Sequence, residues 1–154
     1  MNVFHGSSAP ITEIRADGVF GGLFATPSRK AALSHGDVLH VMEIDDARVL
    51  TQHALSYELD YDTVLAALRN AAHWVDADDL DRAWELVIED AQADGDDARI
   101  LRVDDAGEAG WEAQRLRGVV ARALGYAAVE MSDEHGTTYL VLPGAAIRMA
   151  DEQG

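Results

Sequence analysis

The chain of 154 residues contains no cysteine, which excludes disulfide bonds, thiolate metal sites and a cysteine nucleophile. No stretch approaches the roughly 18 apolar residues of a membrane span, and the N-terminus shows no basic segment followed by an apolar run. We therefore expect a soluble intracellular protein that does not contact membranes. The length predicts a single domain over residues 1–154 with a buried core.

Positive charge is scarce, because 12 Lys and Arg residues stand against 28 Asp and Glu residues, for a net charge of −16. The phosphates of nucleic acid repel such a chain, so direct binding to nucleic acid is not expected. The same charge can steer the protein toward a basic partner, including one whose positive groove holds nucleic acid, or it can serve solubility alone. Charge by itself favours the solubility interpretation.

Several catalytic motifs are also absent. The six histidines show no HExxH or similar spacing, which argues against a zinc centre, and we expect no metal. There is no GxSxG sequence and no phosphate-binding P-loop. Gly18, Gly21 and Gly22 do not form GxGxxG, and no βαβ unit surrounds them, so a Rossmann fold is excluded.

The N-terminal third has a mixed pattern. Thr26 and Pro27 are typical of a helix start, and Gly36 of a helix end. Apolar residues separated by glycines and polar residues predict the other elements. From the N-terminus we expect a strand at 2–5, a helical turn at 10–14 ended by Gly18, a strand at 20–25, a helix up to Gly36 and a strand at 37–44.

The remainder of the chain is first helical and then β. Residues 62–75 and 80–91 repeat apolar residues at helical spacing and predict an inserted helical pair within about 60–95. The polar, glycine-rich stretch 94–110 predicts a loop around a brief strand, and 111–125 an amphipathic helix whose start Trp111 and Glu112 anchor. A hairpin of 126–131 and 137–142 follows, and 145–149 can add an edge strand. This order indicates an α+β fold with a mainly antiparallel sheet.

Three blocks of sequence resemble the ADP-ribosyltransferase superfamily, and its poly-ADP-ribose polymerase branch in particular. They are the apolar strand ending in His-Gly-Ser ("VFHGS", 3–7), a glycine–aromatic block ("VFGGLFAT", 19–26) and a late strand ("TYLVLPGAAIR", 138–148). The blocks occur in the family's order and cover about a third of the chain. The resemblance implies a split antiparallel β core with NAD+ as co-substrate.

A closer resemblance is to the phage-encoded type I-F anti-CRISPR ADP-ribosyltransferases. It rests on the opening "FHGSSAPITEI" and on the unbroken stretch 111–141, which contains Trp-Glu-x-Gln at its start and Asp-Glu-x-Gly in the hairpin. These proteins are similar in length and acidic. The resemblance implies an enzyme of the bacterial host cytoplasm that modifies a protein subunit of the CRISPR surveillance complex and blocks its engagement of DNA.

The resemblance assigns roles to residues near both ends of the chain. The main chain of Gly6, flanked by His5 and Ser7, would hold the nicotinamide amide, while His5 would bind the ribose 2′-OH. When nicotinamide leaves, the ribose becomes oxocarbenium-like, and a fixed carboxylate stabilises that charge. Asp133 or Glu134 would supply this catalytic carboxylate.

Two positions depart from the family pattern. Thr138 stands where many members carry the catalytic glutamate, so either the acids of the hairpin have taken over, with Asp133 favoured, or the site is inactive. Leu23 stands where the stacking tyrosine usually lies, which leaves Phe20, Phe24 or Tyr139 to stack on nicotinamide.

Other interpretations stay open from the sequence. His5 could be a hydrogen-bonded core histidine, and Asp133 and Glu134 ordinary polar residues of a hairpin. The enzyme could be a toxin with another protein target, or the chain could be a non-catalytic acidic decoy that fills a nucleic-acid-binding groove. The sequence does not fix the oligomeric state, and we expect a monomer or a weak dimer.

Overall fold

The computed structural model describes residues 1–133 and 136–150, and of Asp133 the backbone alone. The strands are β1 (Asn2–Ser7), β2 (Leu23–Ala25), β3 (Val38–Glu43), β4 (Val49–Leu50), β5 (Ala128–Asp133), β6 (Gly136–Val141) and β7 (Arg148–Met149). The helices are α1 (Arg29–Leu33), α2 (Tyr61–Ala71), α3 (Leu80–Val87), α4 (Gly95–Leu101) and α5 (Ala106–Ala123), with the short turns η1 (Asp46–Arg48), η2 (Ala54–Glu58) and η3 (Ala77–Asp79).

The strands form two sheets, which confirms the expected α+β fold with a split β core. One sheet has the order β1-β3-β7 and is antiparallel; the other has the order β2-β6-β5-β4, in which β4 pairs parallel with β5. An isolated antiparallel bridge between Phe4 and Thr26 connects β1 to the chain just after β2. Beyond this bridge the two strands separate, and the separation creates the cavity described below.

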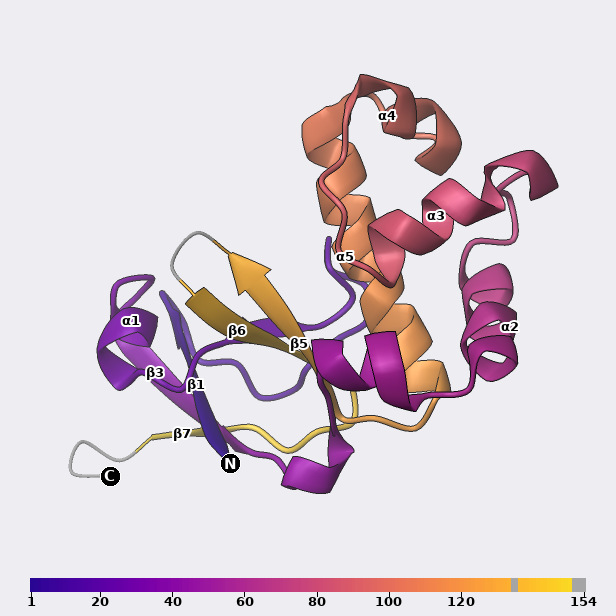
Figure 1. The fold of residues 1–154 in the computed structure, drawn as a ribbon. Coiled ribbons are helices and arrows are strands. Elements are labelled where there is room, and N and C mark those ends of the chain that lie inside the picture. The colour runs from indigo at the N-terminus through magenta and orange to yellow at the C-terminus, as the bar shows by residue number, and fades with distance from the viewer. Residues whose placement is uncertain (134–135, 151–154) are drawn as a thin grey trace.

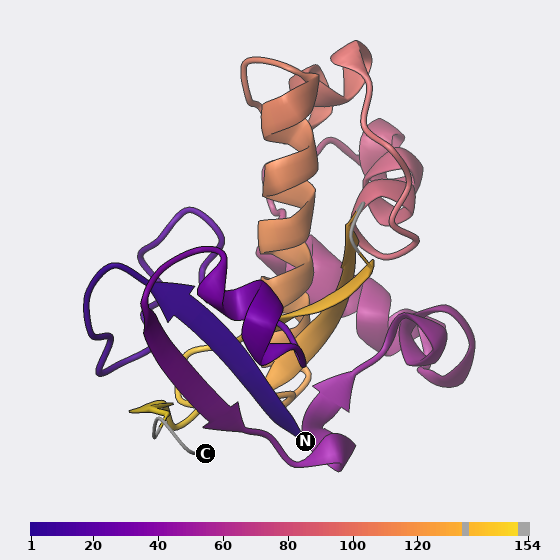
Figure 2. The ribbon, with the colours of Figure 1, turned by 90° about the vertical axis from the view of Figure 1, so that its left-hand side faces the viewer.

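Two hydrophobic clusters hold these layers together. Helix α5 packs on one face of the β5–β6 hairpin around Leu116, Val120 and Leu140, all 0% exposed, and helices α2 and α3 pack against α5 (Figure 1). Val3, Met42 and Val141 form a second cluster between the two sheets. Figure 2 shows α5 standing behind β1 and β3, with the inserted helices gathered around it. The predicted helices at 62–75, 80–91 and 111–125 and the C-terminal hairpin are confirmed, within the element ends above.

The predicted helical turn at 10–14 is wrong. The segment is irregular because it is held by tertiary contacts: the N–H of Ile11 donates to Nε2 of His40 at 2.8 Å, and Ile14 is buried at 4% exposure. Strands β1 and β2, on either side of this segment, also differ from the expected ranges. Strand β1 continues to Ser7 because its pairing with β3 does, while β2 begins only at Leu23, after Gly21 adopts a φ of +69°.

Helix α1 begins two residues later than its sequence signature indicates. Thr26 exchanges backbone hydrogen bonds with Phe4, so it serves the bridge between strands and not the helix. Ser28 is the N-cap instead, and its Oγ accepts the N–H of Ala31 at 3.1 Å.

The expected loop and brief strand at 94–110 are wrong as well, because two capped helices begin there. Asp94 and Asp97 form a reciprocal capping box that starts α4. Asp105 caps α5 by accepting the N–H of Glu108 at 2.8 Å. Trp111 therefore lies within α5, as does Glu112, whose carboxylate pairs with Arg115; neither residue anchors a helix start.

The buried carboxylate of Asp97 predicts a stability effect. Arg82 donates to both of its oxygens at 2.8 Å, and these bonds hold the pKa of Asp97 below 3.8. The depressed pKa means that this stabilisation is complete above pH 3.8 and is lost as the pH falls through the folded-state pKa. We expect Asp97→Ala to lower the free energy of unfolding by about 2–3 kcal/mol in urea at pH 7, since Arg82 stays partly solvated. The exposed neighbour Asp96→Ala is the control and should cost less than about 1 kcal/mol; equal effects would contradict the assignment.

Candidate functional site

A cavity of about 710 Å³ lies where the two sheets separate. The end of β1 contributes His5 and Gly6, the end of β2 contributes Phe24, and α1 with the turn after it contributes Ser34 and His35. The opposite wall comes from Gln114 of α5 and from the β5–β6 hairpin at Ser132, Thr137 and Thr138. The cavity thus joins segments from both ends of the chain, as the resemblance predicts.

The backbone of Gly6 faces the gap between the sheets. Phe4 directs its N–H and C=O away from β3, since both bond to Thr26, at 2.7 and 2.9 Å. In an extended strand the polar groups of alternate residues point the same way, so those of Gly6 also point away from β3. The side-chain position of Gly6 lies under α1 instead, where an added Cβ would be 2.8 Å from the carbonyl carbon of Ala32. Glycine is therefore required here by the packing of α1, and a main-chain donor and acceptor remain directed at the gap.

The ring of His5 occupies the point at which β1 and β2 part. Its Nδ1 lies 2.6 Å from the carbonyl oxygen of Phe24, and because a carbonyl only accepts, Nδ1 carries the proton. In the neutral ring Nε2 is then left as an acceptor. His40, completely buried, supports the same strand: its Nε2 accepts from Ile11 and its Nδ1 lies 3.2 Å from the carbonyl oxygen of His5.

Burial lowers the pKa of His5 below 6.5, chiefly by desolvation; the bond to Phe24 opposes this effect, and His40 and His35 reinforce it. Because the folded-state pKa is the lower one, the unfolded chain binds more protons below pH 6.5, and stability declines there as the pH falls. We expect urea titrations to show a weaker loss of stability below pH 6.5 for His5→Gln than for the wild type. Identical pH dependence of the two proteins would contradict the buried neutral ring.

Of the two catalytic candidates, the structure describes the backbone of Asp133. The backbone of Asp133 ends β5 and pairs with Gly136 of β6, next to Ser132 and Thr137 on the cavity wall. The side chain of Asp133 and the whole of Glu134 lie outside the described residues. Thr138, at the family's usual glutamate position, lines the cavity with a hydroxyl group and supplies no carboxylate.

Three expected cofactor residues are placed outside the cavity lining. The hydroxyl of Ser7 donates to the carbonyl of Ala9, and the ring of Phe20 packs edge-on against Phe24 with centroids 4.7 Å apart. Tyr139 lies on the opposite face of β6 from Thr138, in the cluster between the sheets, where burial raises its pKa. Among the three aromatic candidates, Phe24 is the one that lines the cavity, with Phe20 behind it.

Sequence reasoning missed several polar residues of the cavity wall, among them Gln114, Ser34, His35 and Ser132. Gln114 belongs to the Trp-Glu-x-Gln block that carries the resemblance, so that block contained a usable signal. Ser34, His35 and Ser132 stand in no motif, and their positions depend on how α1 and β5 close the cavity.

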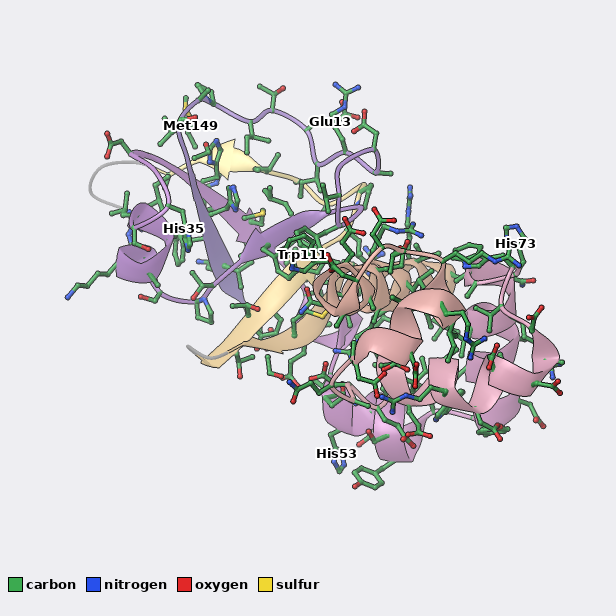
Figure 3. All side chains as sticks on the ribbon, turned by 90° about the horizontal axis from the view of Figure 1, so that it is seen from above. Glu13, His35, His53, His73, Trp111 and Met149 are labelled. Atoms are coloured by element: carbon green, nitrogen blue, oxygen red, sulfur yellow. The ribbon has the colours of Figure 1, made fainter. Side chains whose placement is uncertain are left out.

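Of the other histidines that the structure describes, His35 and His40 lie close enough to His5 to affect its pKa, whereas His53 and His73 lie elsewhere. Figure 3 shows His35 beside the strands and both His53 and His73 on the helical side of the molecule. Among residues 1–133 and 136–150, no three His, Asp or Glu side chains meet as a metal site would require. Within the same part of the chain, no helix combines the length and apolarity needed to cross a membrane.

Comparison with known proteins shows the family to which the chain belongs. The family model described as anti-CRISPR type I-F ADP-ribosyltransferase AcrIF11 matches residues 1–150. The chain thus falls among the enzymes that transfer ADP-ribose, for which NAD+ is the co-substrate. It belongs to the anti-CRISPR type I-F ADP-ribosyltransferase family AcrIF11.

A solved structure supports this assignment. It is described as a crystal structure of an anti-CRISPR protein and is similar to this chain with a TM-score of 0.74 and 41% sequence identity, over 97% of this chain and 95% of the other. No curated protein sequence matches the chain. The resemblance drawn from the His-Gly-Ser strand and from residues 111–141 is confirmed, and the family implies a protein as the target.

Proposed function

We propose that this protein binds NAD+ in the cavity beside His5, cleaves the nicotinamide–ribose bond and transfers ADP-ribose to a protein subunit of the type I-F CRISPR surveillance complex. The observation that carries the proposal is the cavity itself, in which His5 and Gly6 of β1 lie across from the hairpin end that bears Asp133. The single domain would act in the host cytoplasm as a monomer or weak dimer, and the modified complex would no longer engage DNA.

The residues present suit this co-substrate. The cavity volume of about 710 Å³ falls in the range of about 300–1,000 Å³ that is typical of small-molecule sites. The N–H and C=O of Gly6 can bind the donor and acceptor of a carboxamide, and Nε2 of His5 can accept a hydrogen bond from a ribose hydroxyl. The ring of Phe24, held by Phe20, offers an aromatic surface against which a planar ring can stack.

In the transfer, the bond between C1′ of the ribose and the nicotinamide nitrogen breaks, and nicotinamide leaves with the electron pair. A nucleophilic side chain of the target forms the new bond to C1′ and releases its proton to solvent. Positive charge on the ribose rises as the first bond breaks, so a carboxylate fixed nearby lowers the barrier. Because Thr138 stands at the usual position of that acid, we assign the role to the hairpin acids and favour Asp133 over Glu134.

The net charge of −16 is compatible with a target that normally holds nucleic acid. Proteins that bind nucleic acid present clustered lysine and arginine side chains, and an acidic enzyme is drawn to such surfaces. Charge alone equally supports a decoy that fills the groove without catalysis, so the proposal needs a chemical test.

The test is the mass of each subunit of a purified type I-F surveillance complex after incubation with this protein and NAD+. We expect one subunit to gain the mass of one ADP-ribose, and the gain to be absent when NAD+ is omitted. Loss of DNA binding by the complex without any mass gain would favour the decoy. A mass gain on another host protein, with the complex unmodified, would favour a toxin.

A further inference from the structure

An ion pair between the buried Arg117 and the partly exposed Asp90 lies directly behind the hairpin wall of the cavity. Asp90, in the turn that follows α3, accepts a hydrogen bond from the hydroxyl of Ser132 at 3.0 Å through Oδ2. Its other oxygen, Oδ1, lies 3.1 Å from Nη2 of Arg117. Ser132 lines the cavity and directly precedes Asp133 in β5. One carboxylate therefore connects α5 to the end of the strand that bears the proposed catalytic acid.

Arg117 makes this connection rigid. Its side chain is only 2% exposed, its Nε donates to the carbonyl of Val87 at 2.7 Å, and its Nη1 lies 3.5 Å from the sulfur of Met131. Burial lowers the pKa of Arg117, and Asp90 opposes that effect as the neighbouring anion. A buried guanidinium is costly unless it is paired, so Arg117 favours the position of the Asp90 carboxylate in which the two groups form their ion pair.

The backbone of Asp90 is also specialised. Its φ of +59° lies in the left-handed region, which aspartate tolerates better than most residues, and Arg102 is the other such non-glycine residue in the described chain. This conformation ends α3 and turns the carboxylate back toward β5. A loop residue with an unusual φ, a buried cation and a strand-end hydroxyl are thus assembled from three separate elements.

We propose that Asp90 is a positioning residue which, anchored by Arg117, fixes the end of β5 through Ser132 and so sets the place of the catalytic carboxylate. The inference rests on the proposed function, because it assumes that the hairpin acids do the chemistry. It gives the inserted helices a role in the reaction, since the turn after α3 supplies Asp90. Asp90 itself is not part of the cavity lining.

The experiment replaces Ser132. This residue is exposed, so its replacement is expected to change the stability of the fold little. We expect Ser132→Ala to lower kcat for ADP-ribose transfer about tenfold, with the Kd for NAD+ from calorimetry within twofold of the wild type and an unchanged Tm. Ser132→Thr keeps the hydroxyl and should restore at least half of the rate. Ser56→Ala, at an exposed serine of η2 that accepts a hydrogen bond from Gln52, is the matched control and should leave all three quantities unchanged.

A double-mutant cycle separates the connection from a general structural effect. Asp90→Ala should lower Tm, because it leaves Arg117 unpaired, and should lower kcat about as much as Ser132→Ala does. The double variant should be no slower than Asp90→Ala alone, because both changes break one connection. If Asp90→Ala does not fold, the comparison of Ser132→Ala with Ser132→Thr tests the inference by itself.

The inference would be overturned by a kcat for Ser132→Ala within twofold of the wild type. It would also be overturned by a loss that lies entirely in the Kd for NAD+, which would make Ser132 a direct contact. Failure of Ser132→Thr to restore the rate would count against the hydrogen bond in the same way. Failure of the proposed function looks different, since the wild-type protein would then transfer no ADP-ribose at all.

Discussion

Replacement of both hairpin acids, Asp133→Asn with Glu134→Gln, is expected to lower the rate of ADP-ribose transfer about 100- to 1,000-fold. The physical reason is that a fixed charge aimed at a developing charge contributes a factor of this size in enzymes, and the double variant keeps the shape of both side chains while it removes their charge. Asp133→Asn alone should account for most of the loss. The measurement is the initial rate of target modification with labelled NAD+.

The control is Glu13→Gln, which removes one charge from an exposed residue outside the cavity lining (Figure 3). It should modify the target at the wild-type rate. The acid variants should still bind NAD+ within about twofold of the wild-type Kd, because the proposed binding groups lie on β1 and β2. If the double variant modifies the target as fast as the wild type, the catalytic acid lies elsewhere.

Gly6→Ala is expected to have the largest effect on the fold around the cavity. An added Cβ would lie 2.8 Å from the carbonyl carbon of Ala32, still closer to its oxygen, and 3.0 Å from the carbonyl oxygen of Gly36. These are backbone atoms that no rotamer change can move, so α1 must shift off β1. We expect a loss of about 3 kcal/mol or more in unfolding free energy. NAD+ affinity should fall at least tenfold, because α1 forms part of the cavity wall.

Gly110→Ala is the matched control for this substitution. Gly110 lies in α5 with no atom within 4 Å of an added Cβ, so alanine should stabilise the helix by about 0.5–1 kcal/mol. Urea unfolding and calorimetry with NAD+ measure both effects. A Gly6→Ala protein with wild-type stability and affinity would show that α1 does not pack on β1 as described.

The parts of the fold that follow from local periodicity were predictable. Helices α2, α3 and α5 and the C-terminal hairpin all show long amphipathic or alternating patterns. Helix α4 was missed because its polar composition concealed a capping box that Asp94 and Asp97 form. The irregular 10–14 segment was mistaken for a turn of helix because the hydrogen bond from Ile11 to His40 is a tertiary contact.

Some residues of the candidate site were likewise predictable from the sequence, and others were not. The sequence placed His5, Gly6 and Phe24 at one site with the hairpin, and the structure puts all three on a cavity that the hairpin closes. Tyr139 was a plausible stacking residue by type, yet period-two alternation places it on the other face of β6 from Thr138. Asp90 and Ser132 are 42 residues apart and share no motif, so their contact required the folded chain.

The most direct measurement of the central claim is a crystal structure of the protein with NAD+. We predict that the carboxamide of nicotinamide bonds to the main chain of Gly6, that a ribose hydroxyl donates to Nε2 of His5, and that C1′ faces the hairpin end at Asp133. A dinucleotide bound instead in the groove between α5 and the segment that follows α3, beside Trp111, with the cavity at His5 empty, would contradict the assignment.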